Sequence, residues 1–178
     1  MINIQRTCIL LYFSVLIPLI VHPQNEITNQ TDYKEVTIVT ADGVTVYGDL
    51  YTNNKNLSTI LLFHQGGANA RGEYNTIIPK LINEELNILA IDQRVGGSSY
   101  YGSTNRTTDS LTINDYTYCD AYPDLEAALD YLIANEYNGK RILWGSSFGT
   151  ALSIQLTSKR QKDVDALLAF SPSTGNAL

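Results

Sequence analysis

A serine between two glycines is the residue of this chain best placed to act as a nucleophile. Residues 145–149 read Gly-Ser-Ser-Phe-Gly, with Ser147 at the centre of a Gly-x-Ser-x-Gly pattern. A sharp turn from a strand into a helix lifts the hydroxyl of such a serine above a sheet, and small residues, here Gly145 and Gly149, relieve the crowding. The apolar run before this pattern and the helix-compatible run Thr150–Arg160 after it favour that turn over a serine turn without chemistry. We therefore predict that Ser147 is the nucleophile of an acyl-transfer reaction.

A second motif is suited to stabilising the anion that such a reaction forms. His64 begins a His-Gln-Gly-Gly sequence directly after an apolar run. Backbone N–H groups must approach the oxyanion closely, and Gly66 and Gly67 allow that approach. The predicted donors are the amide of Phe148, which follows the nucleophile, and the amide of Gln65 or Gly66. We expect the His64 ring to tie down a loop at the end of a strand and not to transfer protons.

A third motif, Asp-Gln-Arg-Val-Gly-Gly-Ser, begins at Asp92. With this motif in place, the chain resembles the α/β-hydrolase superfamily, and within it the serine esterases grouped with dienelactone hydrolases. The third motif is similar to the Asp-x-Arg-Gly-x-Gly-x-Ser loop of many members, although Val95 stands where glycine is usual. The resemblance covers residues 36–172 in order.

The resemblance implies a serine hydrolase that acts on a small ester or related acyl substrate and uses no cofactor. It implies that Ser147 attacks the acyl carbonyl, and that Asp92 and Arg94 brace a loop and do not react. Dienelactone hydrolases proper carry cysteine at the nucleophile position. The serine found here favours ordinary ester chemistry over their particular substrate.

The resemblance also implies two residues that this sequence does not provide. In the superfamily an acidic residue and then a histidine follow the nucleophile, but no histidine follows Ser147. Asp163 and Asp165 come too early, before or within the last expected strand. A serine hydroxyl without a base is a weak nucleophile at neutral pH. We therefore expect residues 36–178 to be a partial hydrolase domain, with an inactive relative that binds a ligand or partner as the alternative.

The order of the expected elements predicts an α/β fold. Ala41-Asp42-Gly43 suits a turn between two β-rich segments, which predicts an antiparallel hairpin first. From Thr59 onward strands and helices alternate, which indicates a mostly parallel sheet flanked by helices. A nucleotide-binding sheet protein is disfavoured, because neither of its glycine-rich loops occurs. The expected strands are 36–40, 44–50, 59–63, 87–91, 141–144 and 164–170, the expected helices are 73–85, 123–135 and 150–160, and 92–121 is expected as a long polar loop.

The amino-terminal residues are typical of an export signal. Arg6 precedes the apolar run Cys8–Val21, which is short for a membrane span and long enough for a signal-peptide core. We expect a signal peptide at 1–24 and a flexible lead-in at 25–35. The protein would then be exported to the periplasm or the cell exterior, without stable membrane association after cleavage. An uncleaved membrane anchor is the alternative.

Composition argues against several other classes of protein. The 178 residues carry a net charge of −6 with no basic cluster, which disfavours nucleic acid or an anionic membrane as a partner. His22 and His64 have no second ligand at a useful spacing, so no metal site is expected. The only cysteines are Cys8 and Cys119, so no internal disulfide is expected once the leader is removed. The expected partner is a small-molecule ester or acyl substrate.

Overall fold

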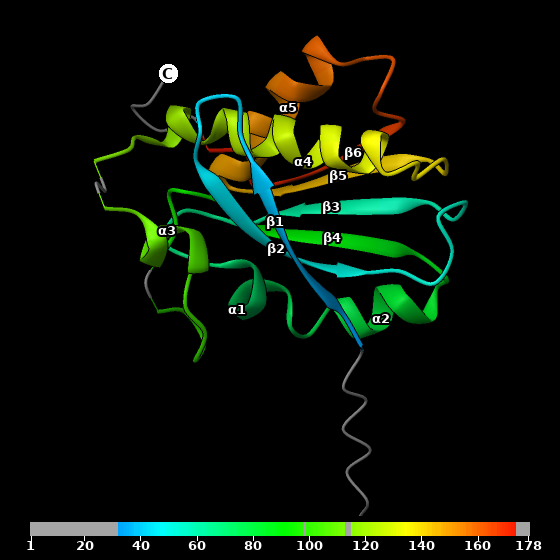
Figure 1. Ribbon diagram of the computed structural model, residues 1–178, viewed down its shortest axis with the longest axis horizontal. Coiled ribbons are helices and arrows are strands. Elements are labelled where there is room, and N and C mark those ends of the chain that lie inside the picture. Colours follow the sequence, from blue (N-terminus) through cyan, green and yellow to red (C-terminus); the bar gives the residue numbers. More distant parts are fainter. Residues whose placement is uncertain (1–31, 98, 113–114, 174–178) are drawn as a thin grey trace, which may run out of the picture.

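A six-stranded mixed sheet forms the centre of the molecule (Figure 1). The computed structural model describes residues 32–97, 99–112 and 115–173. The strand order across the sheet is β1-β2-β4-β3-β5-β6. The strands are β1 (Lys34–Val39), β2 (Thr45–Tyr51), β3 (Thr59–Phe63), β4 (Asn87–Asp92), β5 (Arg141–Ser146) and β6 (Ala166–Phe170).

Two strand directions divide the sheet. β1 pairs antiparallel with β2, and β2 pairs antiparallel with β4. The remaining neighbours, β4-β3-β5-β6, are all parallel. The carboxyl ends of four strands therefore meet at one edge of the sheet, where the three motifs follow β3, β4 and β5. The predicted α/β fold, with a mostly parallel sheet and an antiparallel hairpin at its start, is confirmed.

The hairpin begins earlier than the sequence suggested. Its turn is closed by the N–H of Thr40, which donates to the carbonyl of Val44 at 2.9 Å, and Gly43 supplies the positive φ of 85°. Lys34 and Glu35, expected in the flexible lead-in, already pair with β2. The ladder of backbone hydrogen bonds extends the strand over two polar residues.

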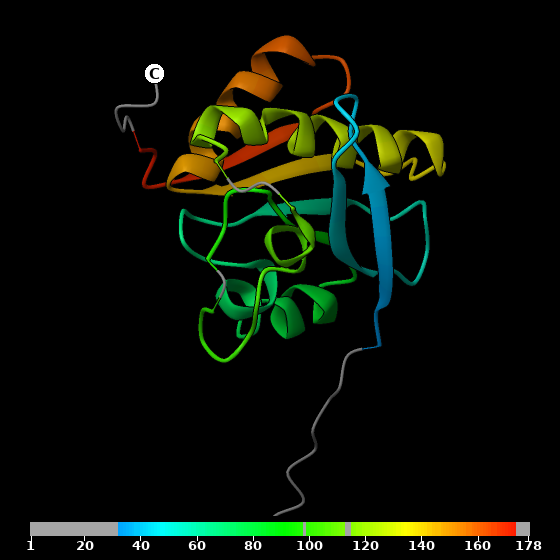
Figure 2. The ribbon, with the colours of Figure 1, turned by 60° about the vertical axis from the view of Figure 1, so that its left-hand side comes forward.

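Helices cover both faces of the sheet (Figures 1 and 2). α4 (Tyr122–Ala134) and α5 (Phe148–Lys159) lie on one face, and α1 (Ala70–Tyr74) and α2 (Ile78–Asn83) lie on the other. A hydrophobic core lies on each face of the sheet, and β3 contributes side chains to both, because its alternate residues point to opposite faces. Burial on both faces explains why this strand reads as a continuous apolar run.

One predicted helix is wrong. A single helix was expected over 73–85, but the structure has α1 and α2 with a turn between them. The reason is Pro79 in the first turn of α2. In one continuous helix its ring would clash with the carbonyl of Asn75, four residues earlier, so the chain stops and restarts.

The segment expected as a long loop contains two short helices. α3 (Arg106–Ser110) begins after Asn105, whose side chain accepts from the N–H of Thr108. A 3₁₀ helix, η1 (Tyr118–Ala121), begins at a capping box formed by Thr117 and Asp120. These caps order the segment next to the carboxyl edge of the sheet.

The predicted signal peptide and residues 25–31 of the lead-in lie outside the described residues. In the part of the chain that the structure describes, no helix is long and apolar enough to cross a bilayer.

Candidate active site

Ser147 lies at the junction of β5 and α5, immediately before the first residue of the helix. Its backbone has φ 52° and ψ −117°, and its side chain is half-buried. A residue with a Cβ adopts this conformation at a cost of about 1–3 kcal/mol. Such a turn is stable only where the surrounding structure imposes it.

Backbone hydrogen bonds impose the turn at Ser147. Its N–H donates to the carbonyl of Phe170, at the end of β6, at 3.0 Å. Its carbonyl accepts from the N–H of Thr150 at 3.1 Å and from the N–H of Ser173 at 3.2 Å. The start of α5 and the chain that follows β6 therefore hold the serine in place together.

The glycines that flank the serine allow this close packing. A Cβ on Gly145 would lie 2.5 Å from the Cα of Thr150. A Cβ on Gly149 would lie 2.6 Å from the carbonyl oxygen of Phe63 and 2.7 Å from that of His64. All of these neighbours are backbone atoms, so no larger residue fits without moving the helix or β3.

The two segments expected to form the oxyanion hole lie side by side. β3 pairs with β5, and Phe63 stands opposite Gly145. Of the two candidate donors after β3, the N–H of Gln65 already donates to Oε2 of Glu73 at 2.8 Å. The candidate donors to an oxyanion are therefore the amide of Gly66 and the amide of Phe148, which lies at the positive amino-terminal end of α5.

His64 is fully buried behind this loop. Its Nε2 accepts from the N–H of Gln93 at 2.9 Å, so the proton must be on Nδ1, which donates to the carbonyl of Gln65 at 2.8 Å. Burial lowers the pKa of His64. With both nitrogens engaged and the neutral form favoured, this ring joins the loop after β3 to the loop after β4.

Asp92 and Arg94 form two separate braces and do not bind each other. Asp92 accepts from the N–H of Ala70, at the start of α1, at 2.9 Å and from Nε of Arg106 at 2.7 Å. Arg94 is buried, and its Nε donates to Oδ1 of Asp124 in α4 at 2.8 Å. Both charged pairs thus anchor helices to the end of β4.

The glycines of the third motif explain how its loop packs. The N–H of Gly97 donates to the carbonyl of Ala68 at 2.8 Å. A Cβ on Gly97 would lie 1.8 Å from the carbonyl oxygen of Gly67, which itself has φ 72°. At Gly97 the loops after β3 and β4 therefore meet backbone to backbone, a contact that only glycine permits.

The sequence reasoning missed an aromatic residue at this site. Tyr118 of η1 stacks on Phe148, with ring centroids 4.7 Å apart and an angle of 27° between the planes. Its hydroxyl lies over Gly66, since a Cβ built there would be 2.6 Å from Oη. The Thr117–Asp120 spacing could have indicated the start of η1. Nothing in the sequence indicates that the ring meets the nucleophile loop.

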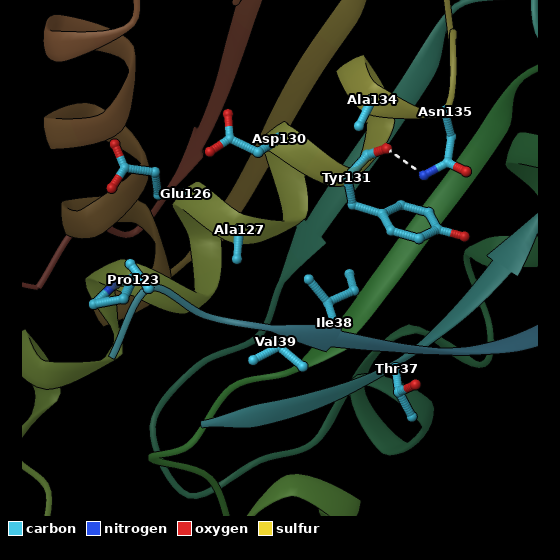
Figure 3. Close-up of a pocket in the computed structure, with 11 residues that line it drawn as sticks. Thr37, Ile38, Val39, Pro123, Glu126, Ala127, Asp130, Tyr131, Ala134 and Asn135 are labelled. Carbon is cyan, nitrogen blue, oxygen red and sulfur yellow. Dashed lines mark hydrogen bonds between the residues drawn. The ribbon is translucent and has the colours of Figure 1, made fainter. Parts of the chain in front are cut away.

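A cavity of about 350 Å³ between β1 and α4 is a separate feature (Figure 3). Val39 of β1 and Ala127 and Tyr131 of α4 are among the residues that line it, and none of the predicted site residues does. We therefore exclude it from the candidate active site. Among the described residues, no three His, Cys, Asp or Glu side chains gather as metal ligands would.

The fold and the serine turn together define a class of protein, the α/β-hydrolase superfamily. Residues 54–177 match the family described as serine aminopeptidase, S33. The chain therefore belongs to this family of α/β-hydrolases, and the resemblance inferred from the three motifs is confirmed. No curated protein matches the sequence.

Several solved structures are similar to this chain. The esterase Pf2001 of Pyrococcus furiosus is 26% identical, with a TM-score of 0.62 over 80% of this chain and 50% of that one. A dienelactone hydrolase from Anabaena variabilis is 17% identical, with a TM-score of 0.59 over 78% and 62% of the two chains. A thermostable carboxyl esterase from Bacillus coagulans is 16% identical, with a TM-score of 0.58 over 76% and 43%. The last two comparisons concern the fold alone. The chain spans about half the length of the esterase.

Proposed function

We propose that this chain supplies the nucleophile and the oxyanion hole of a serine hydrolase that cleaves small esters or related acyl compounds. The observation that carries the proposal is the backbone of Ser147, held at φ 52° between a strand and a helix. Strained residues of this kind cluster at functional sites. The similarity to an esterase that is 26% identical supports an ester as the substrate.

In the proposed reaction, Oγ of Ser147 attacks the carbonyl carbon of the ester while its proton passes to a base. The carbonyl electron pair moves onto the oxygen, where the amides of Phe148 and Gly66 donate hydrogen bonds to it. When the carbonyl re-forms, the bond to the alcohol oxygen breaks, and the alcohol leaves with the proton from the base. Water then attacks the acyl-serine in the same manner, which releases the acid and restores Ser147.

The base in this proposal lies outside the described residues. His64 is the only histidine within them, and both of its ring nitrogens are engaged. We propose that further residues of a complete hydrolase supply the histidine and its acidic partner. The edge of β6 supports this, because Leu168 and Phe170 are 38% and 45% exposed there and offer apolar surface to additional chain.

Imidazole added to the solution can replace the missing base in a direct test. The purified chain is incubated with p-nitrophenyl butyrate at increasing imidazole concentrations, beside Ser147→Ala and the matched control Ser146→Ala, which removes the adjacent hydroxyl. We expect a butyryl adduct on Ser147, found by mass spectrometry of peptides, in the wild type and in S146A. Release of nitrophenol should exceed that of S147A and saturate with imidazole.

A wild-type rate equal to that of S147A at every imidazole concentration, with no adduct, would contradict the proposal. That outcome would favour the second candidate, an inactive relative that binds a ligand, which the engaged nitrogens of His64 support. An amino-acid p-nitroanilide is tested in parallel, because the family is described as an aminopeptidase. Turnover of the anilide without turnover of the ester would assign an amide substrate instead.

We also propose that the protein is exported, on the basis of the charged and apolar residues at its amino terminus. Amino-terminal sequencing of the protein recovered outside the cytoplasm should give a start close to residue 25. Recovery of the uncleaved terminus in the membrane fraction would favour the membrane anchor.

A further inference from the structure

Tyr118 bridges the two segments that carry the oxyanion donors. Its ring stacks on Phe148, the residue after the nucleophile, at a centroid distance of 4.7 Å. Its hydroxyl reaches across to the loop after β3, where a Cβ on Gly66 would lie only 2.6 Å from Oη. The phenol therefore lies beside both residues, Gly66 and Phe148, whose amides are the proposed oxyanion donors.

The local structure of η1 fixes this position. The N–H and the hydroxyl of Thr117 both donate to Oδ2 of Asp120 at 2.7 Å, which closes the capping box around the first turn. Phe148 in turn is buried and meets the His64 ring edge-on at 6.3 Å. Tyr118 itself is 45% exposed, so part of this residue is open to solvent.

One of the two alternative donors after β3 is already engaged. The amide of Gln65 is occupied by the carboxylate of Glu73 at 2.8 Å and cannot turn toward a second anion. Two amides, those of Gly66 and Phe148, remain for the developing oxyanion. A neutral hydroxyl beside them can donate a further hydrogen bond without bringing another negative charge.

We propose that the hydroxyl of Tyr118 is a third hydrogen-bond donor of the oxyanion hole. This inference rests on the proposed function, because it concerns the same reaction at Ser147. The hydroxyl donates to the tetrahedral oxyanion and keeps its own proton, so no proton is exchanged. The ring, stacked on Phe148, holds that donor at the mouth of the site.

The test uses a fluorophosphonate, whose phosphoryl oxygen occupies the oxyanion hole when Ser147 displaces fluoride. Phosphonylation of the chain is followed by mass spectrometry at a fixed imidazole concentration in the wild type, Tyr118→Phe and Tyr118→Ala. The matched control is Tyr101→Phe, because Tyr101 is 78% exposed and its ring packs edge-on against Tyr100. Loss of a single oxyanion donor lowers rates by roughly 100- to 1000-fold in well-studied hydrolases.

We expect Y118F to label at least about tenfold more slowly than the wild type, at an unchanged melting temperature, while Y101F matches the wild type. A smaller fall in Y118F would overturn the inference, since the phenylalanine keeps the packing and loses only the hydroxyl. Faster labelling of Y118A would also overturn it, because it would make the ring an obstacle. A wild-type chain that is not labelled at Ser147 would contradict the proposed function itself.

Discussion

The strain at Ser147 predicts that removing its side chain will stabilise the protein, provided that glycine replaces it. A Cβ at φ 52° and ψ −117° costs about 1–3 kcal/mol, which glycine does not incur. Glycine in turn loses about 0.4–1 kcal/mol through the greater freedom of the unfolded chain. S147G should therefore be about 1 kcal/mol more stable than S147A, which keeps the Cβ and the strain. For a domain of this size that corresponds to about 2–4 °C in melting temperature.

Urea unfolding of the two variants measures this difference, with equal m-values required for the comparison. Gln155 provides the control, because it is exposed within α5. There Q155G should be about 1 kcal/mol less stable than Q155A, the reverse order. If S147G were equal to or less stable than S147A, the turn would store no strain, and the structural argument for a reactive serine would be lost.

Three further predictions concern the residues that support the site. Gly149→Ala should destabilise the fold by about 1–3 kcal/mol in urea unfolding, because its Cβ would press on two carbonyl oxygens at the end of β3. Asp124→Asn should lower the free energy of unfolding by about 1–3 kcal/mol, because it removes the charged partner of Arg94 in α4 and leaves that buried side chain with Asp42 as its remaining carboxylate; a loss below about 0.5 kcal/mol would contradict this pairing. His64 should make the fold less stable as pH falls below about 6.5, because the unfolded chain binds a proton that the folded state, with its lowered pKa, resists. Burial raises the pKa of Asp124 to about 6, which makes the fold more stable as pH falls and so acts in the opposite direction. The free energy of unfolding is therefore measured between pH 7 and 5 in the wild type and in His64→Gln, and its slopes against pH are compared. Equal slopes would show that His64 does not titrate differently on folding.

Local patterns predicted the elements that are buried in a regular manner. β3 has the predicted bounds, because four consecutive apolar residues after Thr59 suit a strand buried on both faces. α4 differs from the prediction by one residue at each end, since Pro123 marks its first turn and Leu125 and Leu129 form its apolar stripe. The helix predicted over 73–85 failed because the apolar spacing was given more weight than Pro79.

Within the site, the spacing of Gly145, Ser147 and Gly149, together with the apolar run before it and the helix-compatible run after it, predicted the strand, turn and helix. The spacing could not distinguish Gln65 from Gly66 as a donor, because the choice depends on the position of the Glu73 carboxylate. The motif that begins at Asp92 suggested that Asp92 and Arg94 brace one loop together. In the structure the two side chains bind separate partners in other elements. Contacts between loops depend on how several turns pack, and no short pattern encodes that.

The sequence by itself determined which residue is the candidate nucleophile, because a glycine-flanked serine between a strand and a helix is a local feature of backbone sterics. Only the tertiary structure decided what surrounds that serine. In the folded chain both ring nitrogens of His64 are hydrogen-bonded, and the amide of Gln65 donates to Glu73. Tyr118 stacks on Phe148, which lies 30 positions later in the chain. Side chains so far apart in sequence meet only because the parallel strands deliver their following loops to one edge of the sheet.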